Sequence, residues 1–414
     1  MTPAARLQAA IEILTALERT DQPADRLLKD WFRSRRYAGS KDRAAVAQRV
    51  FDVLRRRAAL AWQMQDDAPR ALVLADVARS GGDPEILFTG HAYGPAALAD
   101  DEIRALKAPR GEPPLDVLGE FPAFLAPELA RAFGDGVLHE MAALQARAPV
   151  DLRVNTLKAE RDGVLVALRD EGFAAEPTPF APHGIRIPSG EGSAKLGSGR
   201  RFEGGAFEFQ DEAAQIASLL VGAKAGERIL DLAAGAGGKS LAIAAATDNA
   251  AKIVASDVRD GALEQLRLRA DRAGAHVVIE KEPRGTFDAA LLDAPCSGTG
   301  TWRRQPELRW RLTPSRLDQL TAMQDELLDR AAGFVKPGGR LIYATCSILP
   351  RENGARVAAF LARNRAFKCV RADAVWRESV GTPPPPGMGA VFDATPYSTG
   401  TDGFFAAILT RAAP

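Results

Sequence analysis

The amino-acid sequence predicts an α/β chain: a Rossmann-like, mostly parallel sheet with an antiparallel last strand, behind a small α/β module and an all-α domain. Three observations support this prediction. From residue 210 onward, short apolar runs alternate with segments of helical periodicity, which is typical of a parallel sheet covered on both faces. A glycine-rich turn follows the first of these runs, and a polar segment with a cysteine follows two later ones.

Composition narrows the classes of function. The 414 residues carry a net charge of +1, so affinity for nucleic acid must come from a local basic face. The three cysteines, Cys296, Cys346 and Cys369, form no CxxC pair, which argues against a disulfide framework and a structural zinc site. The same cysteine pattern leads us to expect no metal and a reduced, cytoplasmic setting. Charged residues interrupt every long apolar run, so we expect no signal peptide and no membrane span.

The first 145 residues predict helices. Leu7, Ile11, Leu14 and Leu17 recur at helical spacing, and a second periodic stretch covers residues 44–62. Arginines at positions 55–57 lie within this stretch, next to its apolar residues. They form either a solvated helix face or an RNA-contacting face. We therefore expect an all-α, RNA-binding domain over residues 1–145.

The sequence pattern changes after residue 145 from helices alone to a mixture of strands and helices. Residues 146–209 predict a small α/β linker module, with a strand at 151–157, a helix at 159–171 and a Gly- and Ser-rich surface loop at 189–205. Residues 210–414 predict the catalytic domain. Its strands are expected at 228–232, 252–257, 276–280, 288–293, 340–345 and, antiparallel, 404–411, and its longest helix at 314–334.

The turn at residues 232–239 predicts a cofactor site. Its glycines let backbone N–H groups approach a ligand closely, and Asp257 ends the next strand, where a carboxylate can bind ribose hydroxyls. Ala233 stands where a P-loop needs glycine. Asp231 would repel a pyrophosphate, which favours the sulfonium of S-adenosylmethionine over a dinucleotide. The alternative is a tight turn without a ligand.

Cys296 and Cys346 each follow an apolar run and each precede a serine. Because consecutive strands of such a sheet lie side by side, we expect both thiols over one cleft that faces the cofactor turn. A thiolate that adds to C6 of cytosine makes C5 nucleophilic toward a methyl donor, and Asp293 could hydrogen-bond the base edge. The alternatives are small buried hydrophobes for the cysteines, which is our reading of Cys369, and a strand-end cap for Asp293.

With these motifs in place, the chain resembles the RNA cytosine-5 methyltransferases of the Nop/Sun type, also called the Fmu family. The resemblance covers residues 151–411 and rests on LRVNTLK, FQDEAAQIASLL, DLAAGAGGK, DAPCSGTGTWRRQPELRWR, ATCSILPREN and TDGFFAAILTR, in that order. The helices before residue 145 resemble the NusB-type domain of bacterial ribosomal-RNA members.

The resemblance implies roles for single residues. Cys346 matches the attacking cysteine, and Cys296 matches the cysteine that helps to release the product. Asp293 matches the acid at the base and methionine end of the site, Lys239 the lysine beside it, and Asp257 the ribose ligand. The implied cofactor turn comprises Ala233, Ala234, Gly235, Ala236, Gly237, Gly238 and Lys239.

The expected RNA contacts come from two segments. Arg153 and Asn155 match the family's RNA-side strand. Arg303, Arg304 and Arg309, interleaved with tryptophans, suit phosphates and exposed bases. The alternative for this second segment is a charged loop whose tryptophans pack inward.

The chain departs from the family pattern at the cofactor turn. The family commonly reads CAAPGGK there, and this chain lacks the cysteine and the proline, so we expect weaker cofactor binding. An acid near the adenine is also expected, for which Glu280 and Glu282 are the candidates. We expect a monomer that transfers methyl groups from S-adenosylmethionine to cytosine C5 in 16S ribosomal RNA. The alternative is an RNA-binding ribosome-assembly factor with weak or no methyl transfer.

Overall fold

The computed structural model describes residues 1–91, 93–188 and 193–413. The chain divides into two compact units. Unit 1 comprises Met1–Gln145 and Arg304–Leu312, and unit 2 comprises Ala146–Arg303 and Thr313–Pro414. The expected division of unit 2 at residue 209 stays a prediction.

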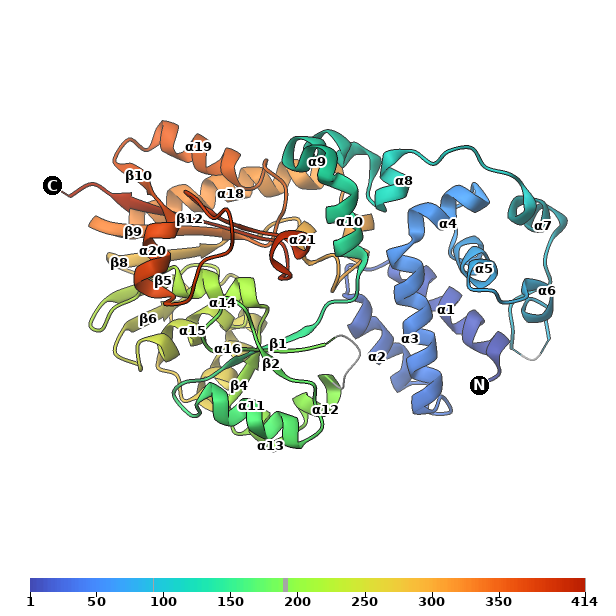
Figure 1. Cartoon of the computed structure of the whole chain (residues 1–414), viewed down its shortest axis with the longest axis horizontal. Helices are drawn as coiled ribbons and strands as arrows, with labels where there is room; N and C mark the ends of the chain where they lie inside the picture. The colour runs from blue at the N-terminus through green and yellow to red at the C-terminus, as the bar shows by residue number, and fades with distance from the viewer. Residues whose placement is uncertain (92, 189–192, 414) are drawn as a thin grey trace. The chain divides into compact units, whose positions relative to one another are not determined.

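Unit 1 is helical throughout the part that the structure describes (Figure 1). Its core consists of apolar side chains at helical spacing, among them Ile13, Val46, Val50 and Leu74, which are fully buried. The helices are α1 (Pro3–Leu17), α2 (Ala24–Arg33), α3 (Ser40–Arg55), α4 (Arg57–Met64), α5 (Pro69–Arg79), α6 (Pro84–Leu87), α7 (Asp100–Lys107), α8 (Leu115–Gly119), α9 (Ala126–Phe133) and α10 (Val137–Gln145).

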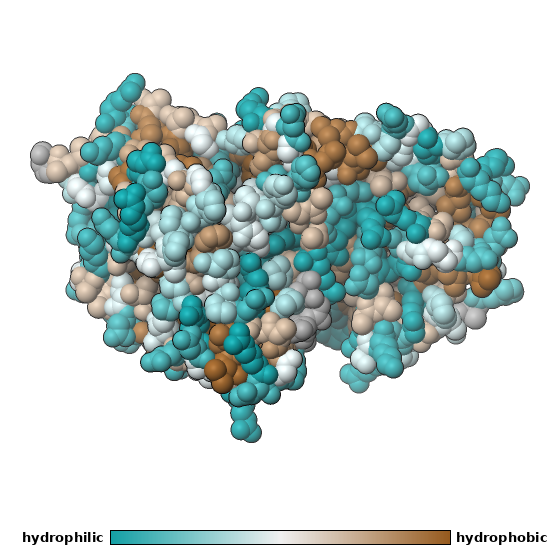
Figure 2. Space-filling view, viewed as in Figure 1, coloured by the Kyte–Doolittle hydropathy of each residue, from teal (hydrophilic) through white to brown (hydrophobic). Residues whose placement is uncertain are grey.

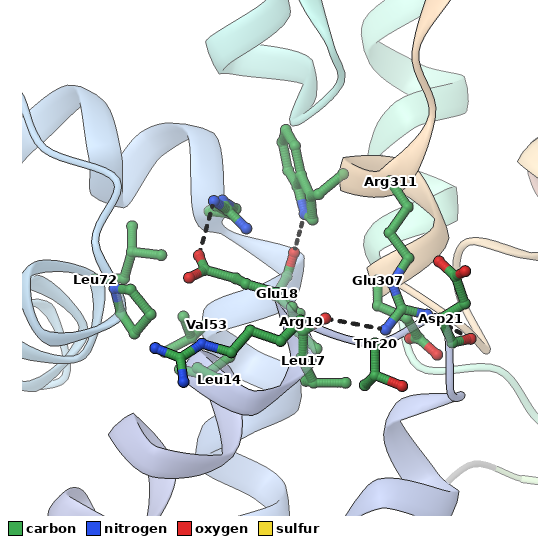
Figure 3. Close-up of a pocket in the computed structure, with 14 residues that line it drawn as sticks. Leu14, Leu17, Glu18, Arg19, Thr20, Asp21, Val53, Leu72, Glu307 and Arg311 are labelled. Carbon is green, nitrogen blue, oxygen red and sulfur yellow. Dashed lines mark hydrogen bonds and ion pairs between the residues drawn. The ribbon is translucent and has the colours of Figure 1, made fainter. Parts of the chain in front are cut away.

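A short helix from far along the chain, α17 (Glu307–Arg311), also belongs to unit 1. Glu307 Oε1 accepts a hydrogen bond from the Ala24 backbone N–H at 2.9 Å, and Trp310 Nε1 donates to the Leu54 carbonyl at 2.7 Å. A cavity of about 690 Å³ lies beside α17, with Glu307 and Arg311 on one wall and side chains of α1, α3 and α5 on the others (Figure 3). Unit 1 is therefore completed by a segment that the sequence places within residues 210–414.

The first sheet of unit 2 is antiparallel, with strand order β2-β3-β1-β4. It is formed by β1 (Val150–Val154), β2 (Glu176–Pro177), β3 (Gly184–Ile187) and β4 (Phe207–Phe209), with α11 (Arg161–Asp170) beside it. The expected loop at 189–205 is wrong where the structure describes it, because α12 (Ser193–Gly197) and α13 (Arg200–Glu203) form there and pack Leu196 and Phe202 into the small core. Residues 189–192 lie outside the described residues.

The second sheet has the strand order β10-β12-β9-β8-β5-β6-β7, and β11 pairs with β12. Its members are β5 (Arg228–Asp231), β6 (Lys252–Ala255), β7 (Val277–Ile279), β8 (Phe287–Asp293), β9 (Val335–Thr345), β10 (Phe367–Val370), β11 (Phe392–Ala394) and β12 (Phe404–Arg411). The strands β5 to β9 run parallel, while β12 runs antiparallel to β9. The Rossmann-like class and the antiparallel last strand are confirmed.

Both faces of this sheet are covered, as the apolar runs require. Leu292 and Tyr343 belong to the core under α18 and α19, whereas Leu291 and Ile342 belong to the core under α14 and α15 (Figure 1). The covering helices are α14 (Glu212–Leu219), α15 (Gly238–Ala246), α16 (Asp260–Ala273), α18 (Pro314–Phe334), α19 (Gly354–Arg363) and α20 (Ala372–Ser379); α21 (Pro396–Thr399) precedes β12.

The surface is mostly hydrophilic on the face drawn in Figure 2, where apolar residues form small scattered groups. Among the described residues, no helix combines the length and the apolar character needed to cross a membrane.

Candidate active site

The glycine-rich turn lies at the carboxyl end of β5, where the sheet meets α15. Gly237 has a φ of +80°, and a Cβ at this position would lie 2.5 Å from Leu266 Cγ, so only glycine fits between the turn and α16. A cavity of about 740 Å³ opens on the turn. It is lined by the expected residues Ala233, Ala234, Gly235, Ala236, Gly238, Lys239, Asp257 and Asp293. Gly237 does not line the cavity and instead sets the path of the backbone.

Asp257 lies just after β6 and contacts the turn directly. Its Oδ2 accepts a hydrogen bond from the Gly235 backbone N–H at 2.9 Å, and Arg259 binds the same carboxylate through Nε at 2.9 Å. Burial opposes ionisation of Asp257, but the hydrogen bonds from Arg259 and Gly235 outweigh it and hold the pKa of the carboxyl below its ordinary value. A ribose hydroxyl would thus meet a carboxylate that is already oriented. Arg259 itself was not anticipated.

One of the two candidates for an adenine-side acid lines the cavity. Glu282 lines the cavity, together with Lys281 and Met323, and it pairs with Arg330 at 3.3 Å. Glu280 is absent from the lining residues. Glu282 is therefore the better placed of the two acids.

Asp231, at the end of β5, is a buried acid in the cavity wall. Its Oδ2 accepts a hydrogen bond from Ser240 Oγ at 2.6 Å, while its Oδ1 is buried without a hydrogen-bond partner among the described residues. Burial is the main reason that the pKa of Asp231 is raised to about 6. An unsatisfied buried acceptor is costly, so this end of the cavity suits a ligand with a donor or a positive charge.

Lys239 and Asp293 form an ion pair at the boundary between cofactor turn and thiols. Lys239 Nζ lies 2.5 Å from Asp293 Oδ2, with the lysine side chain largely buried. Burial would lower the pKa of Lys239, but the Asp293 carboxylate outweighs burial and raises it. The Cys346 thiolate contributes in the same direction, which puts Lys239 within electrostatic reach of that sulfur.

The two thiols meet at the carboxyl ends of adjacent parallel strands, as expected. β8 pairs with β9, and Cys296 Sγ lies 3.3 Å from Cys346 Sγ. Both side chains are partly exposed. The hydrogen bond to Cys346, reinforced by burial and by the charges of Cys346 and Glu352, raises the pKa of the Cys296 thiol well above its ordinary value. Contact with Cys346 and burial thus both oppose a negative charge on Cys296.

Cys369 lies apart from this pair, on the edge strand β10. Its side chain is exposed, so the expectation of a buried hydrophobe is wrong. An edge strand leaves one side open to solvent, which explains the difference.

Sequence reasoning missed a carboxylate that lies behind both thiols. Glu352 is fully buried and accepts hydrogen bonds from Ser297 and Ser347, the residues that follow the two cysteines. The signal was present in the ATCSILPREN segment, where an acid follows Cys346 by a few residues. Its partners could not be inferred because Ser297 and Gln324 come from other parts of the chain.

Arg153 and Asn155, expected to contact RNA, are buried within unit 2. Arg153 Nε donates to Gln210 Oε1 at 2.6 Å, and burial lowers its pKa to about 10. Asn155 Nδ2 donates to the carbonyls of Gly205 and Ala273. Both side chains hold the small sheet against neighbouring parts of unit 2, and their expected contact with RNA stays a prediction.

The second group of expected RNA contacts is also largely buried. Arg303 is 5% exposed and pairs with Asp402 at 2.5 Å, and Arg309 is 0% exposed. Both guanidinium groups are buried, and their expected phosphate contacts stay a prediction. Arg304 is half-buried and stays a prediction. Trp302 is fully buried, as the alternative of inward-packed tryptophans requires.

Two models of known protein families match this chain. Residues 218–410 match the model described as 16S rRNA methyltransferase RsmB/F. Residues 121–191 match the ferredoxin-like domain of RsmF/B-like methyltransferases. Both matches include elements of unit 2.

Curated relatives include ribosomal RNA small subunit methyltransferase B of Salmonella arizonae, 35% identical over 299 residues, which cover 70% of this chain and 66% of the relative. The enzyme of the same name from Photorhabdus laumondii is 33% identical over the same lengths. The aligned region thus spans just under two thirds of these relatives.

Solved structures share the fold. The crystal structure of PH0851 has a TM-score of 0.78 at 24% identity and covers 99% of both chains. NSun6 from Pyrococcus horikoshii, solved with SFG, has a TM-score of 0.62 at 21% identity and covers 72% of this chain and 100% of its own.

Proposed function

The chain belongs to the RsmB/F family of 16S rRNA methyltransferases, and from this premise we propose that it methylates C5 of a cytosine in RNA with S-adenosylmethionine as the methyl donor. The observation that carries the proposal is the contact of two thiols, Cys296 and Cys346, at 3.3 Å beside the Lys239–Asp293 ion pair. A pair of thiols next to a cavity for a methyl donor suits covalent activation of a pyrimidine ring.

Four side chains have a role in the proposed methyl transfer. Cys346 Sγ adds to C6 of the cytosine, and the ring electrons move toward C5 while N3 gains a proton with Asp293 at the base edge. Lys239 faces Cys346 and stabilises negative charge on its sulfur. After methylation, a base removes the C5 proton, Cys346 leaves as a thiolate and the C5–C6 double bond re-forms, while N3 gives up the proton that it gained in the first step. The Cys296 thiol donates a hydrogen bond to that sulfur and so promotes release.

The cavity on the glycine-rich turn fits S-adenosylmethionine. Asp257 would hold the ribose hydroxyls, Glu282 the adenine side, and Asp231, with its unsatisfied Oδ1, the positively charged methionine end. When bound, S-adenosylmethionine supplies a methyl group activated by a sulfonium. Gly235 and Ala236, in place of the more rigid family turn, are expected to weaken this binding.

Methylation and target can be tested together. The purified chain is incubated with S-adenosylmethionine and small-subunit ribosomal RNA from a deletion strain, and cytosine-5 methylation is mapped by bisulfite sequencing. We expect one cytosine to lose its mark in the deletion strain and to regain it in the reaction. An unchanged methylation map in both would exclude the proposed activity on this RNA.

The second candidate is an RNA-binding ribosome-assembly factor without efficient methyl transfer, favoured only by the altered cofactor turn. Calorimetry with S-adenosylmethionine separates the two. Binding at micromolar to submillimolar concentration supports the enzyme, whereas no heat at millimolar ligand supports the assembly factor. We propose further that the chain acts as a cytoplasmic monomer.

RNA contacts are also proposed for the turn between α2 and α3 together with the first turn of α3, because Arg153, Arg303 and Arg309 are buried. Arg36 and Lys41 are exposed, and their side chains make no hydrogen bond or ion pair within the described residues. Tyr37 between them is 70% exposed, which suits stacking on an unpaired base. We expect RNA affinity to fall as the salt concentration rises. In an R36A/K41A variant this fall should be less steep. Each lost phosphate contact should reduce the slope of log affinity against log salt concentration by about one unit. A slope equal to that of the unaltered chain would exclude this turn.

A further inference from the structure

Glu352 is the only described carboxylate that hydrogen-bonds the residues after both thiols. Its Oε1 accepts from the Ser297 backbone N–H at 2.8 Å and from Gln324 Nε2 at 3.0 Å. Its Oε2 accepts from Ser297 Oγ and Ser347 Oγ, each at 2.5 Å. Four donors occupy the four acceptor positions of one carboxylate, which is the arrangement that stabilises a buried negative charge.

The surrounding contacts tie this carboxylate to both cysteine turns. Gln324 of α18 also donates to the Pro295 carbonyl, directly before Cys296. On the other side, Thr299 Oγ1 lies 3.0 Å from Ser347 Oγ. Asn353 supports the same turn, because its Nδ2 donates to the Ser347 carbonyl at 2.8 Å. The two turns are therefore cross-linked through Glu352 and cannot shift independently.

The charges around the thiols are unequal. Three of the four donors to Glu352 lie on the Cys296 side, namely the Ser297 N–H, the Ser297 hydroxyl and the Gln324 amide that also binds the Pro295 carbonyl, so its negative charge opposes a second one on Cys296. The Lys239 ammonium acts on the Cys346 side. Among the described residues, Cys346 and Tyr343 of β9 also interact with Cys296, and Asp293 precedes it by three positions in the chain.

We propose that Glu352 is a positioning residue that holds Cys296 and Cys346 in contact and assigns their roles, by placing a fixed negative charge on the Cys296 side of the pair. This inference rests on the proposed function only for the roles in the reaction. The contact and the charge asymmetry belong to the protein alone, so they can be measured without RNA.

Glu352→Gln removes the charge and keeps the size of the side chain. Site-resolved alkylation with iodoacetamide, followed by mass spectrometry from about pH 6 to pH 10, reports the fraction of Cys296 thiolate. In a Cys346→Ala background, we expect E352Q to lower the alkylation midpoint of Cys296 by about one pH unit, or about tenfold in rate below the midpoint. The matched control is Glu212→Gln, because Glu212 is equally buried but hydrogen-bonds Phe180 and Ala181 instead. E212Q should leave the midpoint unchanged.

Glu352→Asp tests the positioning half, because it keeps the charge and shortens the reach by one methylene. We expect an unchanged Cys296 midpoint but at least about tenfold slower formation of the covalent RNA adduct in a Cys296→Ala background. An unshifted midpoint in folded E352Q, or an unaltered adduct rate in E352D, would overturn the inference. If the unaltered chain methylates no RNA while E352Q still shifts the midpoint, the proposed function fails and the charge asymmetry stands.

Discussion

The turns after β8 and β9 share a Cys-Ser pair and differ in the charged groups near their thiols. Each turn presents a cysteine followed by a serine, and adjacent parallel strands bring the two sulfurs to 3.3 Å. Glu352 takes three of its four hydrogen bonds from Ser297 and Gln324 on the Cys296 side, whereas the Lys239 ammonium interacts electrostatically with Cys346. The difference teaches that two Cys-Ser turns can bring two thiols together, while residues distant in sequence decide which charged groups surround each thiol.

The largest effect is expected from removing each thiol in turn. Cys346→Ala should lower methyl transfer by about a thousandfold or more, because no thiolate can add to C6. Cys296→Ala should instead accumulate a covalent RNA adduct, because the leaving sulfur loses its hydrogen-bond donor. Methyl transfer is followed with labelled S-adenosylmethionine and the adduct by denaturing gel. An adduct in the Cys346 variant and none in the Cys296 variant would reverse the two roles.

The next largest effect is expected from removing the Lys239 ammonium. Lys239→Met is expected to slow adduct formation by roughly ten- to a hundredfold, since it removes the positive charge that favours the attacking thiolate. Lys336→Met is the matched control, because Lys336 pairs with Asp288 at 2.8 Å at the other end of the same two strands. Single-turnover kinetics in the Cys296→Ala background measure the rate. Equal slowing by both variants would mean that the effect is structural.

Variants at Asp257 and Arg259 should weaken cofactor binding without changing the charges around the two thiols. Asp257→Ala is expected to weaken S-adenosylmethionine binding by roughly ten- to a hundredfold, the value of one or two charge-assisted hydrogen bonds. Arg259→Ala should change affinity less, because Gly235 still orients the carboxylate. Calorimetry gives both affinities, and the alkylation midpoint of Cys296 should stay within error of the unaltered chain. A shifted midpoint would show that the charge asymmetry extends beyond the thiol turns.

The smallest expected effect concerns Asp231, at the strand end next to β8. Burial raises its folded pKa to about 6 from 3.8, so the folded state holds this proton more tightly than the unfolded state. Stability from this group is therefore lost as pH rises from about 4 to about 6. The melting temperature of Asp231→Asn, relative to the unaltered chain, should increase between pH 4.5 and about pH 7.5. A constant difference would indicate that Asp231 is ionised throughout.

Local patterns made much of unit 2 predictable. The helix α18 begins and ends at the expected residues, Pro314 and Phe334, because apolar periodicity and a Thr-Pro start define it. The adjacency of β8 and β9 followed from chain order, and it brought the two thiols together. These features depend on residues that are neighbours in sequence or in strand order.

The features that escaped prediction depend on contacts between distant segments. The short strands β10 and β11 form only by pairing with β12, and Glu352 meets Ser297 across 55 residues. Arg309 looked like a surface arginine because α17 is short and charged, and its burial follows from packing in unit 1. Charge and aromatic content therefore indicated the right residue types for RNA binding but not their exposure.

The place of α17 in unit 1 has a consequence for synthesis of the chain. Ala24 and Leu54 are made early, but their partners Glu307 and Trp310 emerge only after most of unit 2 has been translated. At a typical translation rate of about 5 to 20 residues per second, this interval is roughly fifteen to sixty seconds. During that time the nascent helices 1–145 lack one wall of their cavity, and Leu14 and Leu72 stay without the cover of α17. The first part of the protein to be made is therefore among the last to be completed.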